Sequence, residues 1–384
     1  MKSFLINPFF YYGLSFLLSF LIYGLGWSDL YEDLSNDLVF FILVTTILSL
    51  LIGFIISNII KIKSIDKNVM LSYKNIKLIN FVYIAMATLE YAYSGGIPLV
   101  NYALGRSFNY QEFGIPTLHV FFAVYMAVIN LTFFYRYLIT KDKKYLPIIF
   151  FSFFYYISIF SRASLFIEIM CMALIYLFLF GSFRKILYIS ISSIFFLYVF
   201  GVMGNYRMAA LGYDNEDGIL VLGKASQTFQ NSYVPTEFFW SYLYLSSPLA
   251  NLNYQDKRFL ESDRSISAFF YNNILIDTVS KRIASKKIED KLIDESLNVS
   301  TMYGGSIQTY GYEGISIFYI YYMLTCVLLI LFCPRKFLPI MLTLLCILSF
   351  FSIFTNFLRL SGFILQPIFV LVLGRITINR NFLI

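Results

Sequence analysis

Ten apolar runs of about the length needed to cross a lipid bilayer constrain this chain more than any other feature. A hydrocarbon core of about 30 Å needs about 20 mostly apolar residues per helix. With 59% hydrophobic and 13% charged residues, most of the chain cannot form a water-soluble globule. The sequence therefore predicts an all-α polytopic integral membrane protein with about ten transmembrane helices, at residues 8–26, 38–60, 78–94, 117–138, 145–160, 163–182, 185–203, 314–333, 337–353 and 356–374.

The distribution of charge predicts the orientation, because Lys and Arg accumulate on the cytoplasmic side of membrane proteins. The first connection is acidic instead, and the long connection after the seventh run has more acidic than basic residues. Both termini are therefore predicted to be cytoplasmic, and this distribution explains the +7 net charge without nucleic-acid binding. The basic residues of the even-numbered connections and the C-terminal tail are Lys61, Lys63, Lys67, Lys74, Lys77, Lys141, Lys143, Lys144, Arg184, Lys185, Arg335, Lys336, Arg375 and Arg380.

Three segments follow from this topology. Residues 1–203 form a block of seven transmembrane helices, 204–313 a large outward loop, and 314–384 a block of three helices. A second outward segment, 94–116, holds several Gly and Pro residues that interrupt helices. Within the long loop, apolar residues spaced along 276–297 predict an amphipathic surface helix.

Several motifs are absent, which narrows the chemistry. There is no phosphate-binding Walker loop, no dinucleotide fingerprint, no HExxH and no outward Asp-x-Asp. We therefore expect no cofactor and no metal, and a substrate that reaches the outer face already activated, such as a lipid-linked pyrophosphate. The four cysteines are predicted to be small buried apolar residues: Cys171, Cys326, Cys333 and Cys346.

Four arginines lie outside the cytoplasmic connections, at the outer ends of predicted helices or in outward segments. Guanidinium groups bind phosphate oxygens in pairs and stay charged in apolar surroundings, so convergence of these side chains predicts a pyrophosphate site. Alternatively, each arginine reaches toward the lipid surface or pairs with a headgroup, Glu90 or Glu168. The four are Arg162, Arg207, Arg359 and Arg106.

His119 is the only histidine, and it follows Gly114 and Pro116 at the start of the fourth predicted helix. Histidine can accept a proton from an attacking hydroxyl near neutral pH, so His119 is a candidate base. Glu90 and Glu168 are ionisable groups at membrane depth, which makes them functional candidates. Glu168 is six residues from Arg162, so the two side chains do not lie on the same face of a helix. Glu168 is therefore predicted to make a structural polar contact.

Aromatic and polar residues at the start of the long loop are candidates for sugar binding. Tyr206, Trp240 and Tyr244 could stack on sugar faces, or they could form an interfacial aromatic belt. Residues 246–251, which include Asn251, and residues 304–306 are predicted to be turns where the backbone approaches a ligand or another helix.

The arrangement resembles the Wzy-type O-antigen polymerases, also called oligosaccharide repeat-unit polymerases. The likeness covers the whole chain and includes Phe-Gly-Ile-Pro-Thr-Leu-His at 113–119, Ser-Arg at 161–162, Gly-Asn-Tyr-Arg at 204–207 and Ser-Pro-Leu-Ala-Asn at 247–251. The resemblance implies a metal-independent, GT-C-like glycosyltransferase of the bacterial inner membrane. Such an enzyme moves a growing glycan from undecaprenyl pyrophosphate to the non-reducing end of the next lipid-linked repeat unit.

By this resemblance, Arg162 and Arg207 match the arginines that hold the anionic donor, and His119 matches the histidine of the Gly-Ile-Pro motif. Its role as base is our inference, and Glu90 or Glu237 could serve instead. The expected partners are the lipid-linked oligosaccharide and membrane lipids, with a chain-length regulator as a further candidate. Three alternatives stay open: a flippase for lipid-linked oligosaccharides, a related O-antigen ligase, and a scaffold without activity.

Overall fold

Helices form wherever the sequence predicts an apolar run. The computed structural model describes residues 6–59, 76–106, 112–210, 218–283 and 291–379. Within these ranges the only β contact is a single bridge between Ser28 and Ala225. The helices at the ten runs are α2 (Pro8–Tyr23), α3 (Asn36–Ile59), α4 (Ile76–Tyr93), α6 (Leu118–Thr140), α7 (Leu146–Ser158), α8 (Arg162–Phe180), α9 (Phe183–Ala210), α15 (Gly304–Phe332), α16 (Leu338–Phe351) and α17 (Ser361–Asn379).

Five of these helices are long and apolar enough to cross a membrane: α3, α6, α8, α15 and residues 184–209 of α9. Others are shorter; α7 has 13 residues, which at 1.5 Å per residue extend about 20 Å. An all-helical, membrane-embedded polytopic protein is thereby supported. The count of ten crossings and the likeness to the GT-C fold stay predictions.

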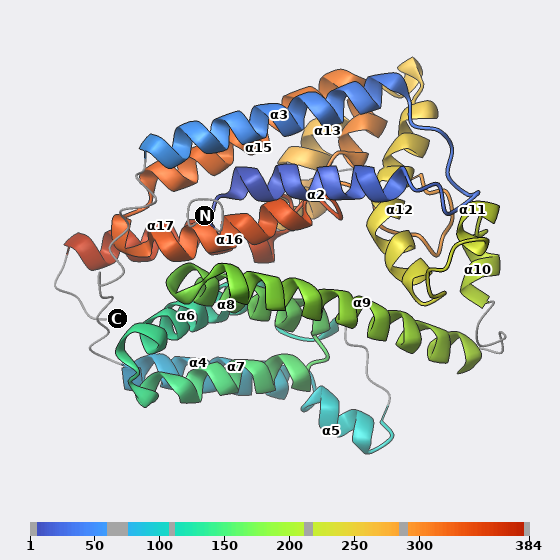
Figure 1. The fold of residues 1–384 in the computed structure, drawn as a ribbon. Helices are drawn as coiled ribbons and strands as arrows, with labels where there is room; N and C mark the ends of the chain where they lie inside the picture. Colours follow the sequence, from blue (N-terminus) through green and yellow to red (C-terminus); the bar gives the residue numbers. More distant parts are fainter. Residues whose placement is uncertain (1–5, 60–75, 107–111, 211–217, 284–290, 380–384) are drawn as a thin grey trace.

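The long helices lie roughly side by side in two groups (Figure 1). In one group, α2 packs against α3 and α16, and α15 and α17 lie beside them. In the other, α6 packs against α7 and α8, with α4 alongside. Contacts of α6 with α17 and of α8 with α16 join the two groups. Helix α9 lies along the outside with few buried residues.

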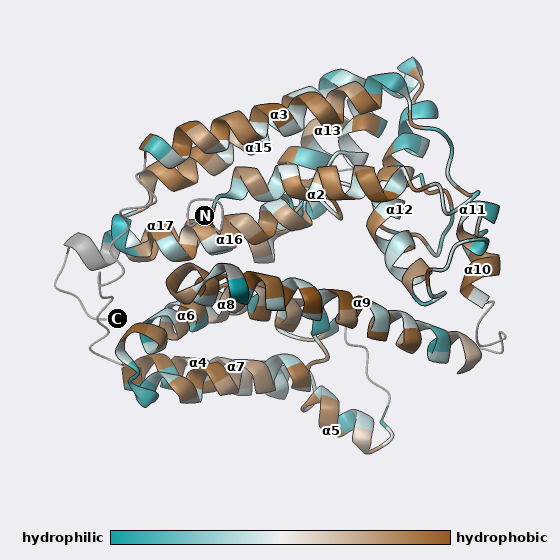
Figure 2. Ribbon diagram, viewed as in Figure 1, coloured by the Kyte–Doolittle hydropathy of each residue, from teal (hydrophilic) through white to brown (hydrophobic). Residues whose placement is uncertain are grey.

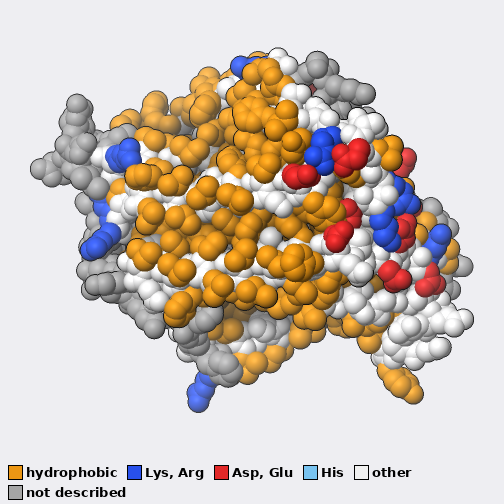
Figure 3. All heavy atoms as spheres, turned by 90° about the horizontal axis from the view of Figure 1, so that it is seen from above, with side chains coloured by type: hydrophobic (Ala, Val, Ile, Leu, Met, Phe, Trp, Pro, Cys, Tyr) orange, Lys and Arg blue, Asp and Glu red, His pale blue; other side chains and the backbone are white. Residues whose placement is uncertain are grey.

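Most residues of the helices are hydrophobic (Figure 2), and many large apolar side chains are exposed. On the face shown in Figure 3 they form a broad belt, with Asp and Glu gathered at one end only and Lys and Arg without acidic neighbours at the opposite end. This is the pattern expected of a bundle embedded in lipid. Which end faces the cytoplasm stays a prediction, and Lys61, Lys63, Lys67, Lys74 and Arg380 lie outside the described residues.

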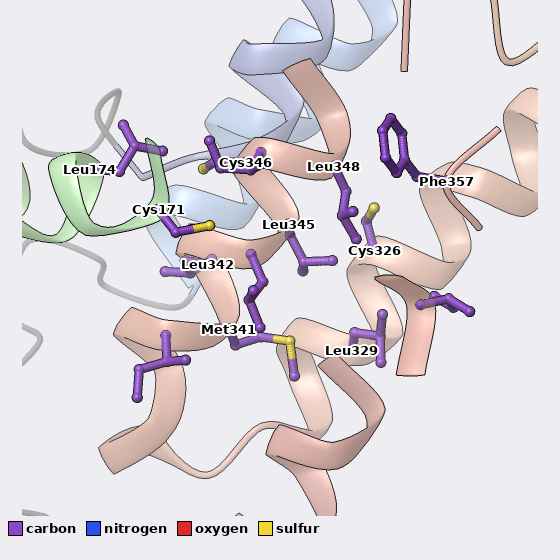
Figure 4. Close-up of a cluster of buried hydrophobic side chains, with 14 of the residues drawn as sticks. Cys171, Leu174, Cys326, Leu329, Met341, Leu342, Leu345, Cys346, Leu348 and Phe357 are labelled. Atoms are coloured by element: carbon purple, nitrogen blue, oxygen red, sulfur yellow. The ribbon is translucent and has the colours of Figure 1, made fainter. Parts of the chain in front are cut away.

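The main core is formed by apolar side chains between the two groups of helices. Figure 4 shows part of it, where Cys171 of α8 and Cys346 of α16 lie among Leu and Met side chains. All four cysteines are buried and free, which confirms their predicted role as small apolar residues.

The helix α9 continues seven residues beyond the predicted end of its run, so Gly204, Asn205, Tyr206 and Arg207 are helical rather than the start of a loop. Polar residues do not end a helix by themselves, and here tertiary contact supports the extension. A Cβ at Gly204 would lie 2.5 Å from the Trp240 ring, so glycine permits the close approach of helix α12 (Phe238–Lys257).

Residues 246–251 lie inside α12 and not in a turn, so this prediction is wrong. Pro248 lacks an N–H and its ring crowds the preceding turn, which disfavours a helix interior. Here the hydroxyl of Ser19 in α2 donates to the Leu245 carbonyl at 2.7 Å, and α12 packs closely on α2. The predicted approach to another helix is therefore correct. Residues 304–306, also predicted as a turn, form the first turn of α15.

The described part of the long connection between α9 and α15 contains the 20-residue helix α12 and several short helices, packed on one end of the bundle (Figure 1). Of the predicted amphipathic helix 276–297, only Asp277–Ile283 is helical; 291–297 is irregular, and 284–290 lies outside the described residues. The division at 203 and 313 stays a prediction, and α9 and α15 extend across both boundaries. The short helices, with one before α6, are α5 (Pro98–Ala103), α10 (Gly218–Leu222), α11 (Gln227–Gln230), α13 (Ile266–Phe269) and α14 (Asp277–Ile283).

A buried asparagine joins the first two helices and gives a test of the fold. Asn7 is fully buried, its Oδ1 accepts from Phe9 N at 3.1 Å, and its Nδ2 donates to Gly53 O and Ser57 Oγ, both at 2.8 Å. We expect Asn7→Ala to destabilise the protein by roughly 2 kcal/mol or more, because three hydrogen bonds are lost. A thiol-reactive dye, which reads exposure of the buried cysteines on heating, measures this.

The matched control is Asn36→Ala, because Asn36 is an exposed residue at the start of α3. It should shift the unfolding temperature little. Equal unfolding temperatures for Asn7→Ala and the unmodified protein would contradict the assigned role of Asn7.

Candidate functional site

The candidate site begins with a buried carboxylate on α4. Glu90 has no exposed surface, and its Oε1 and Oε2 lie 3.0 and 3.1 Å from Nδ1 of His119, the second residue of α6. The hydroxyl of Tyr155, on α7, donates to the same carboxylate. Because Nδ1 faces Glu90, the other ring nitrogen, Nε2, is the one available to a ligand.

The chain before α6 is shaped to place this ring. Gly114 has φ of +90°, and a Cβ there would lie 2.7 Å from His119 Nδ1, so the position requires glycine for both conformation and space. Gly114 N donates to Ser94 Oγ at 2.9 Å, which ties this segment to the end of α4. The ring of Phe113 meets the imidazole edge-on, with centroids 5.8 Å apart.

His119 lines a cavity of about 190 Å³ between α6, α8 and α17. The first turns of all three helices border it, through His119 of α6, Ser164 of α8, and Gly362 and Phe363 of α17. Further along α6 and α8 the lining becomes apolar, with Glu168 as the acidic exception. We call this space the His119 cavity. It combines a histidine at its polar end with an apolar interior.

The N-terminal ends of α6 and α8 are free to attract a negative charge. Neither end has a side-chain cap; the N–H groups of His119 and Arg162 donate to the carbonyls of Ile115 and Phe160, both at 2.9 Å, and the helix dipole places partial positive charge at both ends. Arg162 is the first residue of α8, is exposed, and makes no side-chain hydrogen bond or ion pair within the part of the chain that the structure describes. These groups favour an anion beside the His119 cavity.

The start of α17, the third helix that borders the His119 cavity, is held to the long loop by hydrogen bonds of Asp277. Its carboxylate accepts from Ser361 N at 3.0 Å and from the Ser361 hydroxyl, at the first residue of α17, and Asp277 N donates to Arg359 O at 2.8 Å. Burial raises the pKa of Asp277, but the hydrogen bonds from Ser361 and the charge of Lys281 outweigh it, so this pKa is below its usual range. Arg359 itself has a buried Nε without a partner in the described chain.

Arg282, from the same loop segment, donates to the hydroxyl of Thr117 at 3.2 Å, just before α6. Residues 277–282 therefore connect the starts of α17 and α6, on either side of the His119 cavity. The sequence analysis missed Arg282 and Tyr155. Arg282 lies in a predicted surface helix and Tyr155 among many apolar aromatic residues, so neither had a signal that set it apart.

Arg207 lies at a different cavity, of about 140 Å³, where α9 ends against α10 and α12. Its guanidinium carbon is 5.5 Å from the centre of the Trp240 ring. Tyr244 and Ser247 of α12 and residues 296–299 line the same space. We call this the Arg207 cavity. Arg207 is the only one of the four predicted arginines among the residues that line these two cavities, and Arg162 lies two residues before Ser164, which lines the His119 cavity.

The remaining predicted residues have other surroundings. Tyr206 is 73% exposed and Arg106 is exposed, next to residues outside the described ranges. Asn251 is fully buried, and its side chain bonds the backbone of Leu297, Val299 and Ile293, so it holds this loop in place.

Neither acidic candidate pairs with Arg162. Glu90 contacts His119 and Tyr155, whereas buried Glu168 accepts from Asn130 of α6, in agreement with its predicted structural role.

No family model matches this chain, and no curated protein or solved structure does.

The Asp277 contact predicts a pH effect. Because its pKa is lower in the folded than in the unfolded protein, the contact stabilises fully above the unfolded value of about 4 and is lost as pH falls through the lower folded value. We expect Asp277→Asn to cost about 1 kcal/mol at pH 7 and to flatten the stability profile below pH 5. Thermal unfolding of both proteins from pH 3 to pH 7 measures this.

The control is Asp294→Asn, since Asp294 is exposed and its side chain bonds Ser296, two residues away in the chain. Its effect at pH 7 should be at most about 0.5 kcal/mol. Parallel pH profiles for Asp277→Asn and the unmodified protein would refute the assignment.

Proposed function

We propose that this protein is a bacterial inner-membrane glycosyltransferase that polymerises lipid-linked oligosaccharide repeat units of the O-antigen type. It transfers the growing glycan from undecaprenyl pyrophosphate to the non-reducing end of the next lipid-linked unit, on the outer face of the membrane. The observation that carries this proposal is the Glu90–His119 pair, which lies at a largely apolar cavity bordered by the starts of α6 and α8, with the unpaired Arg162 at the first position of α8.

In the proposed reaction, His119 is the general base. An acceptor hydroxyl attacks the anomeric carbon of the donor sugar, its proton moves to Nε2 of His119, and the bond between sugar and pyrophosphate breaks. Glu90 acts through His119: it holds Nδ1–H and stabilises the imidazolium that forms. No group has to supply energy, because the pyrophosphate is already a good leaving group.

The leaving pyrophosphate is an anion, so its departure requires positive charge near the polar end of the His119 cavity. Arg162 and the first-turn N–H groups of α6 and α8 provide it, with partial positive charge that needs no rearrangement during the reaction. The apolar part of the His119 cavity suits the first units of a lipid chain attached to that pyrophosphate.

The test is the lipopolysaccharide profile of a strain in which this gene is deleted and then replaced by variants. We expect His119→Ala and Arg162→Ala to collapse the ladder to core plus a single repeat. Loss of a charge-assisted phosphate contact costs roughly 2 kcal/mol, about thirtyfold in rate. Arg162→Lys should restore part of the length, because lysine keeps the charge without the fork. Membrane expression is checked by blot.

The same profile separates the alternatives. A flippase or a ligase predicts loss of every repeat, including the first, and a scaffold predicts normal chains from the single variants. A normal ladder from expressed His119→Ala or Arg162→Ala protein overturns the proposed mechanism.

Gly114 offers a test of geometry alone. Gly114→Ala places a Cβ against the imidazole, so we expect it to shorten the glycan about as strongly as His119→Ala. Gly95→Ala is the matched control: Gly95 also has positive φ, +76°, but a Cβ there would contact nothing within 4 Å. Both variants introduce backbone strain, and only Gly114→Ala moves the ring. Equal glycan lengths for the two would refute the role given to the His119 position.

A further inference from the structure

The Arg207 cavity contains a cation without a protein counter-charge. Arg207 is exposed at the C-terminal end of α9, and no ion pair joins it to a carboxylate in the described ranges. Its guanidinium lies over the ring of Trp240, a contact that orients an arginine but leaves its charge unneutralised. A ligand of this cavity should therefore carry a negative charge.

The two aromatic rings of the cavity are held in fixed positions. The indole N–H of Trp240 donates to Asn205 Oδ1 at 2.7 Å, so its polar edge is already satisfied. Tyr244 is 44% exposed and packs edge-on against Phe200, with centroids 5.1 Å apart. A fixed and exposed ring of this kind is suited to stack on the C–H face of a sugar.

The remaining polar groups match a ligand with several hydroxyls. Ser247 of α12 and Ser296 and Asn298 of the loop line the cavity together with Arg207 and Tyr244. The loop is fixed there by Asn251, whose side chain bonds Leu297 O and Val299 O at 2.6 and 2.8 Å. Within an otherwise largely apolar lining, these hydroxyl and amide groups offer hydrogen bonds that a sugar can use and an acyl chain cannot.

We propose that the Arg207 cavity binds a carboxylated sugar, such as a hexuronic acid, within the glycan. Arg207 pairs with the carboxylate and Tyr244 stacks on the ring. The inference rests on the proposed function for the glycan nature of the ligand, and it adds a second, non-reacting sugar site apart from the His119 cavity. Such a site would hold an acidic repeat while its end reacts elsewhere.

The chain has two tryptophans, Trp27 and Trp240, which makes a direct binding experiment possible. In the full-length protein with Trp27→Phe, Trp240 is the only tryptophan and lies in the cavity. Its fluorescence is titrated with glucuronic and galacturonic acid, with glucose and galactose, and with inorganic phosphate and glycerol phosphate. We expect a saturable change with the uronic acids and at least tenfold weaker responses to the neutral sugars and both phosphates.

The variants test the role of the charge. Arg207→Gln should weaken uronic-acid binding about tenfold or more, and Arg207→Lys should retain part of it. Arg258→Gln is the matched control, because Arg258 also lies over a ring, that of Tyr254, but pairs with Glu32 and lies outside the cavity. It should leave binding unchanged. Thermal unfolding confirms that each variant is folded.

Three results would overturn the inference: no saturable change up to about 100 mM uronic acid, equal responses to neutral sugars, or a response to phosphates that matches that to uronic acids. The last would assign the cavity to a lipid headgroup or free phosphate. The binding experiment requires no glycan transfer, so its failure with an intact His119-dependent ladder removes only this inference. Binding in a protein whose deletion leaves the ladder unchanged would instead remove the proposed function.

Discussion

A carboxylate buried among apolar helices has to be hydrogen-bonded, and this requirement organises the centre of the molecule. Burying an ionised group without partners costs several kcal/mol, so Glu90 can stay at membrane depth only with groups placed around it. His119 from α6 and Tyr155 from α7 supply them. Three helices are thereby brought to one point, and the imidazole is presented with a defined nitrogen toward the neighbouring cavity.

The surroundings of this pair are arranged by close backbone approaches and by loop contacts. Gly114 lets the chain pass against the imidazole, and residues 277–282 bind the starts of α6 and α17 together. As a result, the starts of α6, α8 and α17 meet at the cavity where the histidine lies. The long loop therefore contributes to the site by fixing helix ends, through Asp277 and Arg282, in addition to forming the Arg207 cavity with Asn298.

Most of the helices can be predicted from the hydrophobic pattern alone, and some of the site residues can be identified as candidates from the sequence. Glu90 and His119 were both candidates, because an ionisable group in an apolar run and a lone histidine stand out in this composition. Their pairing was not predicted: 29 residues separate them, and only the packing of α4 against α6 brings them together. The prediction that Arg162 and Arg207 converge assumed that residues at the outward ends of different helices line one common site. The structure instead places Arg207 against Trp240, at a separate cavity.

The sequence by itself determined the apolar helices, the buried cysteines and the acidic and basic ends, because these depend on residue type and local spacing. Tertiary structure decided where helices end and which side chains meet. Pro248 lies inside α12, where Ser19 of α2 bonds the nearby Leu245 carbonyl, and Gly204 inside α9 admits the Trp240 ring. Such outcomes depend on contacts between residues far apart in the chain, which no local pattern specifies.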